Sequence, residues 1–163
     1  MPQSSWDALV DRQLGYSGFG PELHQAIRDT RTAVIGAGGN GSVLDLLVRA
    51  GFMRFTIIDG DHVEDTNLNR LPFDRTAVGL PKTEAWRRHL LAVNPECELA
   101  LHTRFIKGAD HVWLREALSG ARLAFLGTTD VEANIVAGRL CAQIGIRMMI
   151  GPASSGSLIV GTF

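Results

Sequence analysis

The chain has 163 residues, 45% of them apolar and 20% charged, which is the ordinary balance for one compact domain with a single core. Sixteen basic side chains against seventeen acidic ones leave a formal charge of −1, which argues against a nucleic-acid-binding protein and against a charged membrane surface. Because the sequence shows neither a secretory signal nor an apolar run long enough to span a bilayer, we expect a cytoplasmic protein.

Residues 1–30 form the first predicted unit, an N-terminal helical arm. Its apolar side chains recur at helical spacing, first at Trp6, Leu9, Val10 and Leu14, then at Leu23, Ala26 and Ile27. Glycines at 15, 18 and 20 and Pro21 interrupt this pattern. The arm is therefore predicted to hold two short helices.

Residues 31–163 form the second predicted unit, in which short apolar runs alternate with amphipathic stretches. The apolar runs predict strands at 32–35, 55–58, 98–102, 123–126, 148–150 and 158–160. Between them, Val43, Leu46, Leu47 and Ala50 share one helical face, Pro81 and Lys82 open a helix that ends before Asn94, and a further helix covers 130–144. This alternation predicts a Rossmann-like, doubly wound α/β fold with a mainly parallel sheet. Ligands are expected beyond the carboxyl ends of its strands.

A glycine-rich loop joins the first strand of this unit to its first helix. Gly36, Gly38, Gly39 and Gly41 let the backbone approach a phosphate closely, and the start of the following helix favours negative charge. The same glycines satisfy the Gly-x-Gly-x-x-Gly pattern of dinucleotide sites, and Asp59 closes the second strand where such sites hold ribose hydroxyls. A nicotinamide- or flavin-dependent oxidoreductase is therefore an alternative at this point.

The polar segment after the second strand distinguishes an ATP-binding site from a dinucleotide-binding site. A triphosphate needs cations and amide donors, which Asn67, Arg70 and Lys82 could supply. Each residue also has a plain interpretation: Asp61 and Glu64 as solvated loop charges, and Arg70 as part of a surface ion pair. Together, directly after a glycine loop, they favour ATP as the ligand.

In this order the motifs resemble those of the ThiF/MoeB/HesA group of adenylyltransferases, which are related to ubiquitin-activating enzymes. The resemblance is carried by residues 11–14 (Asp-Arg-Gln-Leu), 36–42, 59–61 (Asp-Gly-Asp), 67–70 (Asn-Leu-Asn-Arg), Lys82 and 128–130 (Thr-Thr-Asp). It implies that Gly39 packs near the phosphates and Asp59 holds the ribose. It further implies that Asn67 and Arg70 contact the triphosphate, that Lys82 steadies its charge, and that Asp130 holds Mg²⁺.

The resemblance also implies a reaction, a partner and an assembly. The C-terminal carboxylate of a ubiquitin-like or sulfur-carrier protein ending in glycine would attack the α-phosphate of ATP and release pyrophosphate. Because a carboxylate is already ionised at pH 7, the reaction needs no general base. The enzyme would be a homodimer in which Arg12 reaches the triphosphate of the neighbouring subunit; the alternative is that Arg12 pairs with Asp7 or Asp11.

The chain departs from the family pattern in two places. The family carries Asn directly after the aspartate that corresponds to Asp130, and Arg a few positions on. This chain has Val-Glu-Ala-Asn-Ile at residues 131–135, so Asn134 is the candidate substitute for that Asn. The alternative for Asp130 is a purely structural role as a helix N-cap. The sequence also ends in or just past an apolar run, so we expect the adenylation domain at 31–163 to be C-terminally incomplete. It would then lack the segment in which the family often carries a reactive cysteine and a set of zinc-binding cysteines. A non-catalytic dimer partner that only binds nucleotide is therefore a further alternative.

The remaining chemically reactive side chains are predicted to be structural. The five histidines show no metal-site spacing. Cys97 lies between two acids that would raise its pKa, and Cys141 falls within an apolar helical stretch. We therefore expect no thioester on this chain, with the adenylate as the last covalent state.

Overall fold

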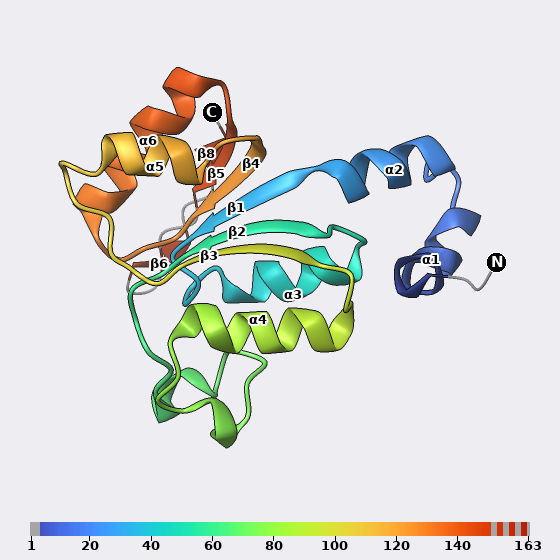
Figure 1. The fold of residues 1–163 in the computed structure, drawn as a ribbon, viewed down its shortest axis with the longest axis horizontal. Helices are drawn as coiled ribbons and strands as arrows, with labels where there is room; N and C mark the ends of the chain where they lie inside the picture. The colour runs from blue at the N-terminus through green and yellow to red at the C-terminus, as the bar shows by residue number, and fades with distance from the viewer. Residues whose placement is uncertain (1–3, 151–152, 155–156, 159–160, 163) are drawn as a thin grey trace.

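The computed structural model describes the backbone of residues 4–150, 153–154, 157–158 and 161–162, and the side chains of residues 4–150. Parallel strands form most of one sheet in the order β3-β2-β1-β4-β5, with β8 antiparallel at the β5 edge. Their bounds are β1 Arg31–Ile35, β2 Arg54–Ile58, β3 Glu98–His102, β4 Ala121–Leu126, β5 Arg147–Ile150 and β8 Gly161–Thr162. The chain builds outward from β1 to β3, then crosses to β4 on the other side of β1 (Figure 1). The strand order therefore reverses between β1 and β4, which is where doubly wound sheets bind ligands.

Near its C-terminus the chain forms a second, short antiparallel pair, β6 Ala153–Ser154 with β7 Ser157–Leu158. The strand predicted at 158–160 overlaps β7 at Leu158, and its other two residues lie outside the described part of the chain.

Helices cover both faces of the sheet (Figure 1). On one face lie α3 Gly41–Arg49 and α4 Lys82–Val93; on the other lie α5 His111–Ala117 and α6 Val131–Ile144. Alternate residues of each strand supply the two cores, because successive side chains of a strand point to opposite faces. The core under α3 and α4 includes Val34, Phe55, Ile57, Trp86 and Leu90, and the core under α5 and α6 includes Ile35, Ile58, Leu126, Ala137 and Leu140.

The predicted apolar face of α3 is partly wrong. Val43 and Leu47 pack against the core as expected, but Leu46 is 66% exposed, whereas Leu44 and Val48 are completely buried. Five of the nine residues of this helix are Val or Leu, so the sequence contains more than one possible apolar stripe. In the folded chain the stripe that contains Leu44 and Val48 faces the core shared with α4 and the sheet.

The predicted arm contains α1 Ser5–Val10, the 3₁₀ segment η1 Asp11–Gly15 and α2 Pro21–Asp29. Trp6 anchors it: its indole Nε1 donates a hydrogen bond of 2.7 Å to the carbonyl of Gly51, in the turn that precedes β2. The arm therefore lies at the amino-terminal edge of the strands, remote from their carboxyl ends (Figure 1). Within the described part of the chain, no helix combines the length and apolar character needed to cross a membrane.

Candidate functional site

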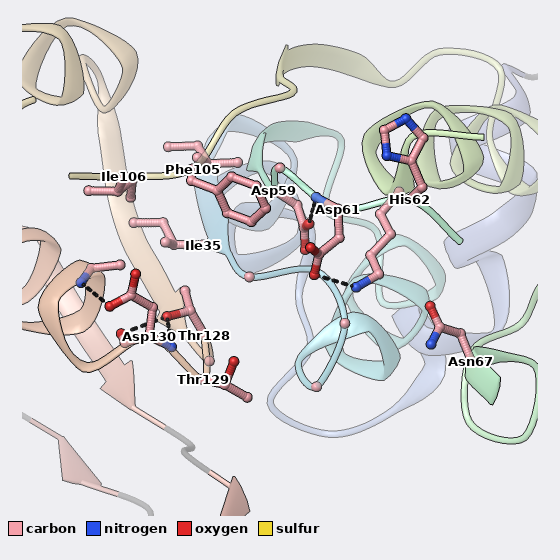
Figure 2. A pocket seen from close by; sticks show the side chains of 18 of the residues that line it. Ile35, Asp59, Asp61, His62, Asn67, Phe105, Ile106, Thr128, Thr129 and Asp130 are labelled. Atoms are coloured by element: carbon pink, nitrogen blue, oxygen red, sulfur yellow. Dashed lines mark hydrogen bonds and ion pairs between the residues drawn. The ribbon is translucent and has the colours of Figure 1, made fainter. Parts of the chain in front are cut away.

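A cavity of about 380 Å³ opens at the carboxyl ends of β1, β2 and β4 (Figure 2). Its walls are the glycine loop after β1, the polar segment after β2, the start of α4, and the loops after β3 and β4. In Figure 2, Asp59 and Asp61 lie on one side and Thr128, Thr129 and Asp130 on the other. The cavity thus occupies the place that the strand order predicts for a ligand.

The loops after β1 and β4 touch each other directly. Gly36 has a φ of +82°, and a Cβ there would lie 2.8 Å from the amide nitrogen of Thr128. Gly127 donates a hydrogen bond of 3.0 Å to the carbonyl of Ile35, and the carboxamide of Asn40 occupies the space that a Gly127 side chain would need. Position 36 therefore requires glycine, and Gly127 leaves room for the Asn40 side chain, so the two backbones can lie against each other beside the cavity.

Asp59 links the glycine loop to the segment after β2. Its side chain is 8% exposed, one carboxylate oxygen accepts a 2.7 Å hydrogen bond from the Ala37 amide, and the other accepts a 2.8 Å bond from the Asp61 amide. Burial raises the pKa of Asp59, an effect only partly offset by these amides and by the charge of Lys82. Since each oxygen can accept a second hydrogen bond, the carboxylate keeps capacity for the hydroxyls of a ribose.

Lys82 brings a cation to the glycine loop. Its Nζ donates a hydrogen bond of 2.8 Å to Asp61, and it lies 3.4 Å from the position that a Cβ on Gly38 would take. The residue is 8% exposed although it lines the cavity, and its backbone amide donates to the carbonyl of Asp61 at 2.9 Å. The ammonium group is thus held at the cavity wall, beside backbone that can approach an anion.

Asn67 and Arg70 also line the cavity, but they differ in burial and in their hydrogen bonds. Asn67 is 5% exposed and its side-chain oxygen accepts a hydrogen bond from the Glu64 amide at 3.3 Å, so part of its capacity stabilises the local turn. Arg70 is exposed and donates to the Thr66 carbonyl at 2.8 Å. No carboxylate within the described residues lies at ion-pair distance from Arg70, which removes the alternative of a surface ion pair for this cation.

Asp130 caps α6 and lines the cavity at the same time. One of its oxygens accepts hydrogen bonds from the amides of Glu132 at 2.8 Å and Ala133 at 3.2 Å. Asn134, the candidate substitute for the family asparagine, donates its side-chain amide to the Thr128 carbonyl at 2.8 Å and does not line the cavity. Asp130 can therefore cap α6 and still face a ligand in the cavity. Asn134 instead stabilises the loop after β4 through its hydrogen bond to Thr128.

The structure does not bring Gly41 or Arg12 into the cavity. Gly41 is buried below the glycine loop, where a Cβ would lie 2.6 Å from both Leu71 and the indole of Trp86. Arg12 is exposed on η1, at the opposite edge of the sheet, and forms no ion pair with any described side chain, Asp7 and Asp11 included. Arg12 can therefore serve a cavity only if that cavity belongs to another subunit.

The loop after β3 contributes residues that sequence reasoning missed. Arg104, Phe105 and Ile106 line the cavity, as does His62, which was predicted to be structural. The Arg104 guanidinium lies 4.1 Å from the Trp113 ring centroid and donates a 2.7 Å hydrogen bond to Asp110. The signal that could have found this loop is its position, because it follows a strand whose carboxyl end lies at the same edge as those of β1 and β2.

Both cysteines are poor nucleophiles in the structure. Burial raises the pKa of the Cys97 thiol to about 11, with Glu96 adding to the effect, and burial alone raises that of Cys141 to about 11. The predicted direction for Cys97 is confirmed, but burial contributes more than the neighbouring acid. Neither thiol is ionised near pH 7.

Comparison with known proteins identifies the family: the sequence profile of the ThiF family matches residues 10–159. The chain belongs to the ThiF family. Among its ThiF-family relatives, ubiquitin-like modifier-activating enzyme 5 of Caenorhabditis briggsae is 39% identical over 89 residues, which are 54% of this chain and 21% of the relative. The enzyme of the same name from Drosophila ananassae is 40% identical over 89 residues, 54% of this chain and 22% of the relative. The chain thus matches about a fifth of the length of these relatives.

Solved structures confirm the Rossmann-like fold. Escherichia coli tRNA N6-threonylcarbamoyladenosine dehydratase, TcdA, superimposes with a TM-score of 0.85 at 24% identity, over 98% of this chain and 66% of that protein. E. coli MccB, solved with MccA-N7isoASN, superimposes with a TM-score of 0.79 at 24% identity, over 95% of this chain and 47% of that protein.

Proposed function

We propose that this ThiF-family chain is the nucleotide-binding part of an ATP-dependent adenylyltransferase. The observation that carries the proposal is the convergence of the glycine loop, the buried carboxylate of Asp59 and the cations Arg70 and Lys82 on one cavity. Cations and backbone amides suit a triphosphate, and a carboxylate suits ribose hydroxyls. A solved structure of TcdA in complex with ATP, with a TM-score of 0.80 at 24% identity over 95% of this chain and 61% of that protein, supports this choice of nucleotide.

The proposed reaction joins an acceptor carboxylate to the nucleotide. An oxygen of the acceptor's terminal carboxylate attacks the α-phosphorus; a carboxyl-to-phosphorus bond forms, and the bond from that phosphorus to the oxygen of the leaving pyrophosphate breaks. Charge develops on the phosphate oxygens, and Arg70 and Lys82 stabilise it by charge-assisted hydrogen bonds. An ionised carboxylate needs no proton removed, so no side chain has to act as a base.

Mg²⁺ fits this cavity as a nucleotide-borne ion. One oxygen of Asp130 is engaged by amides, while the other accepts no hydrogen bond from a described residue and belongs to a side chain that lines the cavity. No group of three potential ligands occurs among the described residues, and Mg²⁺ commonly binds through one or two carboxylates together with substrate phosphates. When bound, the ion would neutralise phosphate charge, and Asp130 would hold it.

The proposed acceptor is a ubiquitin-like or sulfur-carrier protein with a C-terminal glycine. The names of the curated relatives support a protein acceptor, and the solved complex of MccB with MccA-N7isoASN supports a polypeptide one. We assign residues 31–163 to the adenylation domain and residues 1–30 to an arm that serves assembly.

The arm leads to a proposal about the active oligomer, a homodimer in which Arg12 completes the site of the neighbouring subunit. Its exposure, its lack of an ion pair among the described side chains and its distance from its own cavity support this role. Mixing tests it, because a dimer of Arg12→Ala with Arg70→Ala contains one intact site if Arg12 acts across the interface. Partial recovery of pyrophosphate exchange is expected; no recovery despite demonstrated mixed dimers would refute the role.

Thermal unfolding with competing nucleotides tests the proposed function. A ligand at a hundredfold excess over its Kd stabilises the folded chain by about 2.7 kcal/mol, so ATP with Mg²⁺ should raise the melting temperature more than NAD does. Asp59→Ala should remove most of the ATP shift. An equal or larger shift with NAD would favour the oxidoreductase alternative, and ATP binding without pyrophosphate exchange for any acceptor would favour a non-catalytic dimer partner.

A further inference from the structure

Trp86 connects the core of the protein to the glycine loop. The residue is completely buried on α4, and its indole Nε1 donates a hydrogen bond of 2.9 Å to the carbonyl of Ala37. Phe73 packs edge-on against the ring at a centroid distance of 4.9 Å, and Gly41 lies directly beneath it. Close packing therefore fixes the orientation of the indole and the direction of this hydrogen bond.

The direction of the Ala37 carbonyl determines where the next amide points. The C=O and N–H of one trans peptide unit are coplanar and point in opposite directions. Because the Ala37 carbonyl points toward Trp86, the N–H of Gly38 points away from the core, and Gly38 lines the cavity. Among the described residues nothing accepts a hydrogen bond from the Gly38 amide. The donor is thus free at the wall where the Lys82 ammonium also lies.

A chain of hydrogen bonds also links Ala37 to Lys82, which lies on the same helix as Trp86. The Ala37 amide donates to Asp59, the Asp61 amide donates to the other oxygen of Asp59, and Lys82 donates to Asp61, at 2.7, 2.8 and 2.8 Å. Lys82 and Trp86 are one turn apart on α4. Asp59 and Lys82 are thus held by hydrogen bonds that do not involve the indole, whose own bond fixes only the Ala37–Gly38 peptide.

We infer that Trp86 is a positioning residue for phosphate recognition, acting through the Ala37–Gly38 peptide to aim the Gly38 amide at an anionic oxygen of the bound nucleotide. This inference rests on the proposed nucleotide-binding function. Trp86 does not line the cavity. Its effect is therefore specific to the phosphate part of the ligand and absent for the nucleoside part.

The test compares Trp86→Phe with Trp6→Phe in the full 163-residue chain. Trp6 is a matched control, because its indole also donates to a buried backbone carbonyl, that of Gly51 at 2.7 Å, but in the arm. Both variants lose the same kind of hydrogen bond and a similar volume. Calorimetric titration should show ATP binding weakened about fivefold or more in Trp86→Phe, and unchanged in Trp6→Phe. Adenosine binding should be the same in both variants and in the native chain.

A second variant separates the lost hydrogen bond from lost packing. Replacing Trp86 by 3-benzothienylalanine keeps the shape of the ring and exchanges the N–H for sulfur, so it serves if Trp86→Phe does not fold. It should weaken ATP binding as Trp86→Phe does; native ATP affinity in this variant would overturn the inference.

A readout without nucleotide keeps the inference separate from the proposed function. If the native chain does not bind ATP, the proposed function fails, and the loop geometry is then read from the backbone amide of Gly38 in ¹⁵N spectra. Loss of the indole donor should shift this resonance, whereas Trp6→Phe should leave it in place. An unmoved Gly38 amide in both Trp86 variants would refute the positioning role whatever the ligand.

Discussion

Gly127→Ala probes the contact between the two loops that border the cavity. Gly127 does not have a positive φ, so alanine can adopt its backbone conformation and any cost must be steric. The new Cβ would overlap the Asn40 carboxamide and lie 2.6 Å from its oxygen. Asn40 is 8% exposed, so its side chain cannot swing freely into solvent.

The expected loss of stability follows from overpacking, which costs about 1 to 3 kcal/mol when a buried group has to move. For a domain of this size, 1 kcal/mol corresponds to about 2 to 4 °C, so the melting temperature should fall by about 2 to 12 °C. Asn40→Ala deletes the three atoms that the new methyl group would strike, together with a buried amide nitrogen that has no partner among the described residues. In that background Gly127→Ala should be neutral or stabilising by up to about 1 kcal/mol.

Thermal and urea unfolding of the two single variants and the double variant measure this coupling. Gly138→Ala is the control, since its Cβ would lie 3.9 Å from Leu126 in ordinary contact, and it should cost nothing. The reasoning is refuted if Gly127→Ala destabilises the chain equally with and without the Asn40 carboxamide.

Three further predictions concern the chemistry of the site. Because burial raises the pKa of Asp59 above its usual 3.8, the preference for ATP over its 2′,3′-dideoxy analogue should fall as pH drops through this raised pKa. Asp59→Asn should abolish that pH dependence, and a preference that grows toward acid pH would contradict it. Lys82→Met removes a cation and leaves Asp61 unpaired beside the phosphates. Titration should then show ATP binding weakened about 10- to 100-fold, with adenosine binding little changed. Equal losses of affinity for ATP and adenosine would argue against a contact between Lys82 and the phosphates. Changing Cys97 and Cys141 to Ser should leave adenylate formation intact, and a thiol-sensitive adduct with a ubiquitin-like protein that either change abolishes would contradict the assigned chemistry.

The strand–helix alternation and the main site motifs could be predicted from the sequence because they are local. Buried parallel strands appear as continuous apolar runs, so β1 to β5 were located to within two residues, and 98–102 agrees with β3 at both ends. Asp59, Asp61 and Lys82 line the cavity, and local sequence could single them out because each lies within three residues of the end of β2 or at the start of α4. Local sequence signals locate such elements and residues when local preference and overall fold agree.

What escaped prediction depends on contacts between distant parts of the chain. The hydrogen bond from Trp86 to Ala37 joins residues 49 positions apart, and nothing in either local sequence marks it. Gly41 fits a phosphate-loop pattern, but the structure uses it as space for that same indole. Arg104 and Phe105 enter the cavity because β3 pairs with β2, and that pairing is a property of the folded sheet.

A crystal structure with a non-hydrolysable ATP analogue tests the central claim most directly. The account predicts the triphosphate against the Gly38 amide and within reach of Arg70 and Lys82, with the ribose hydroxyls on Asp59. A nucleotide bound outside the cavity, or one whose phosphates point away from both cations, would contradict it.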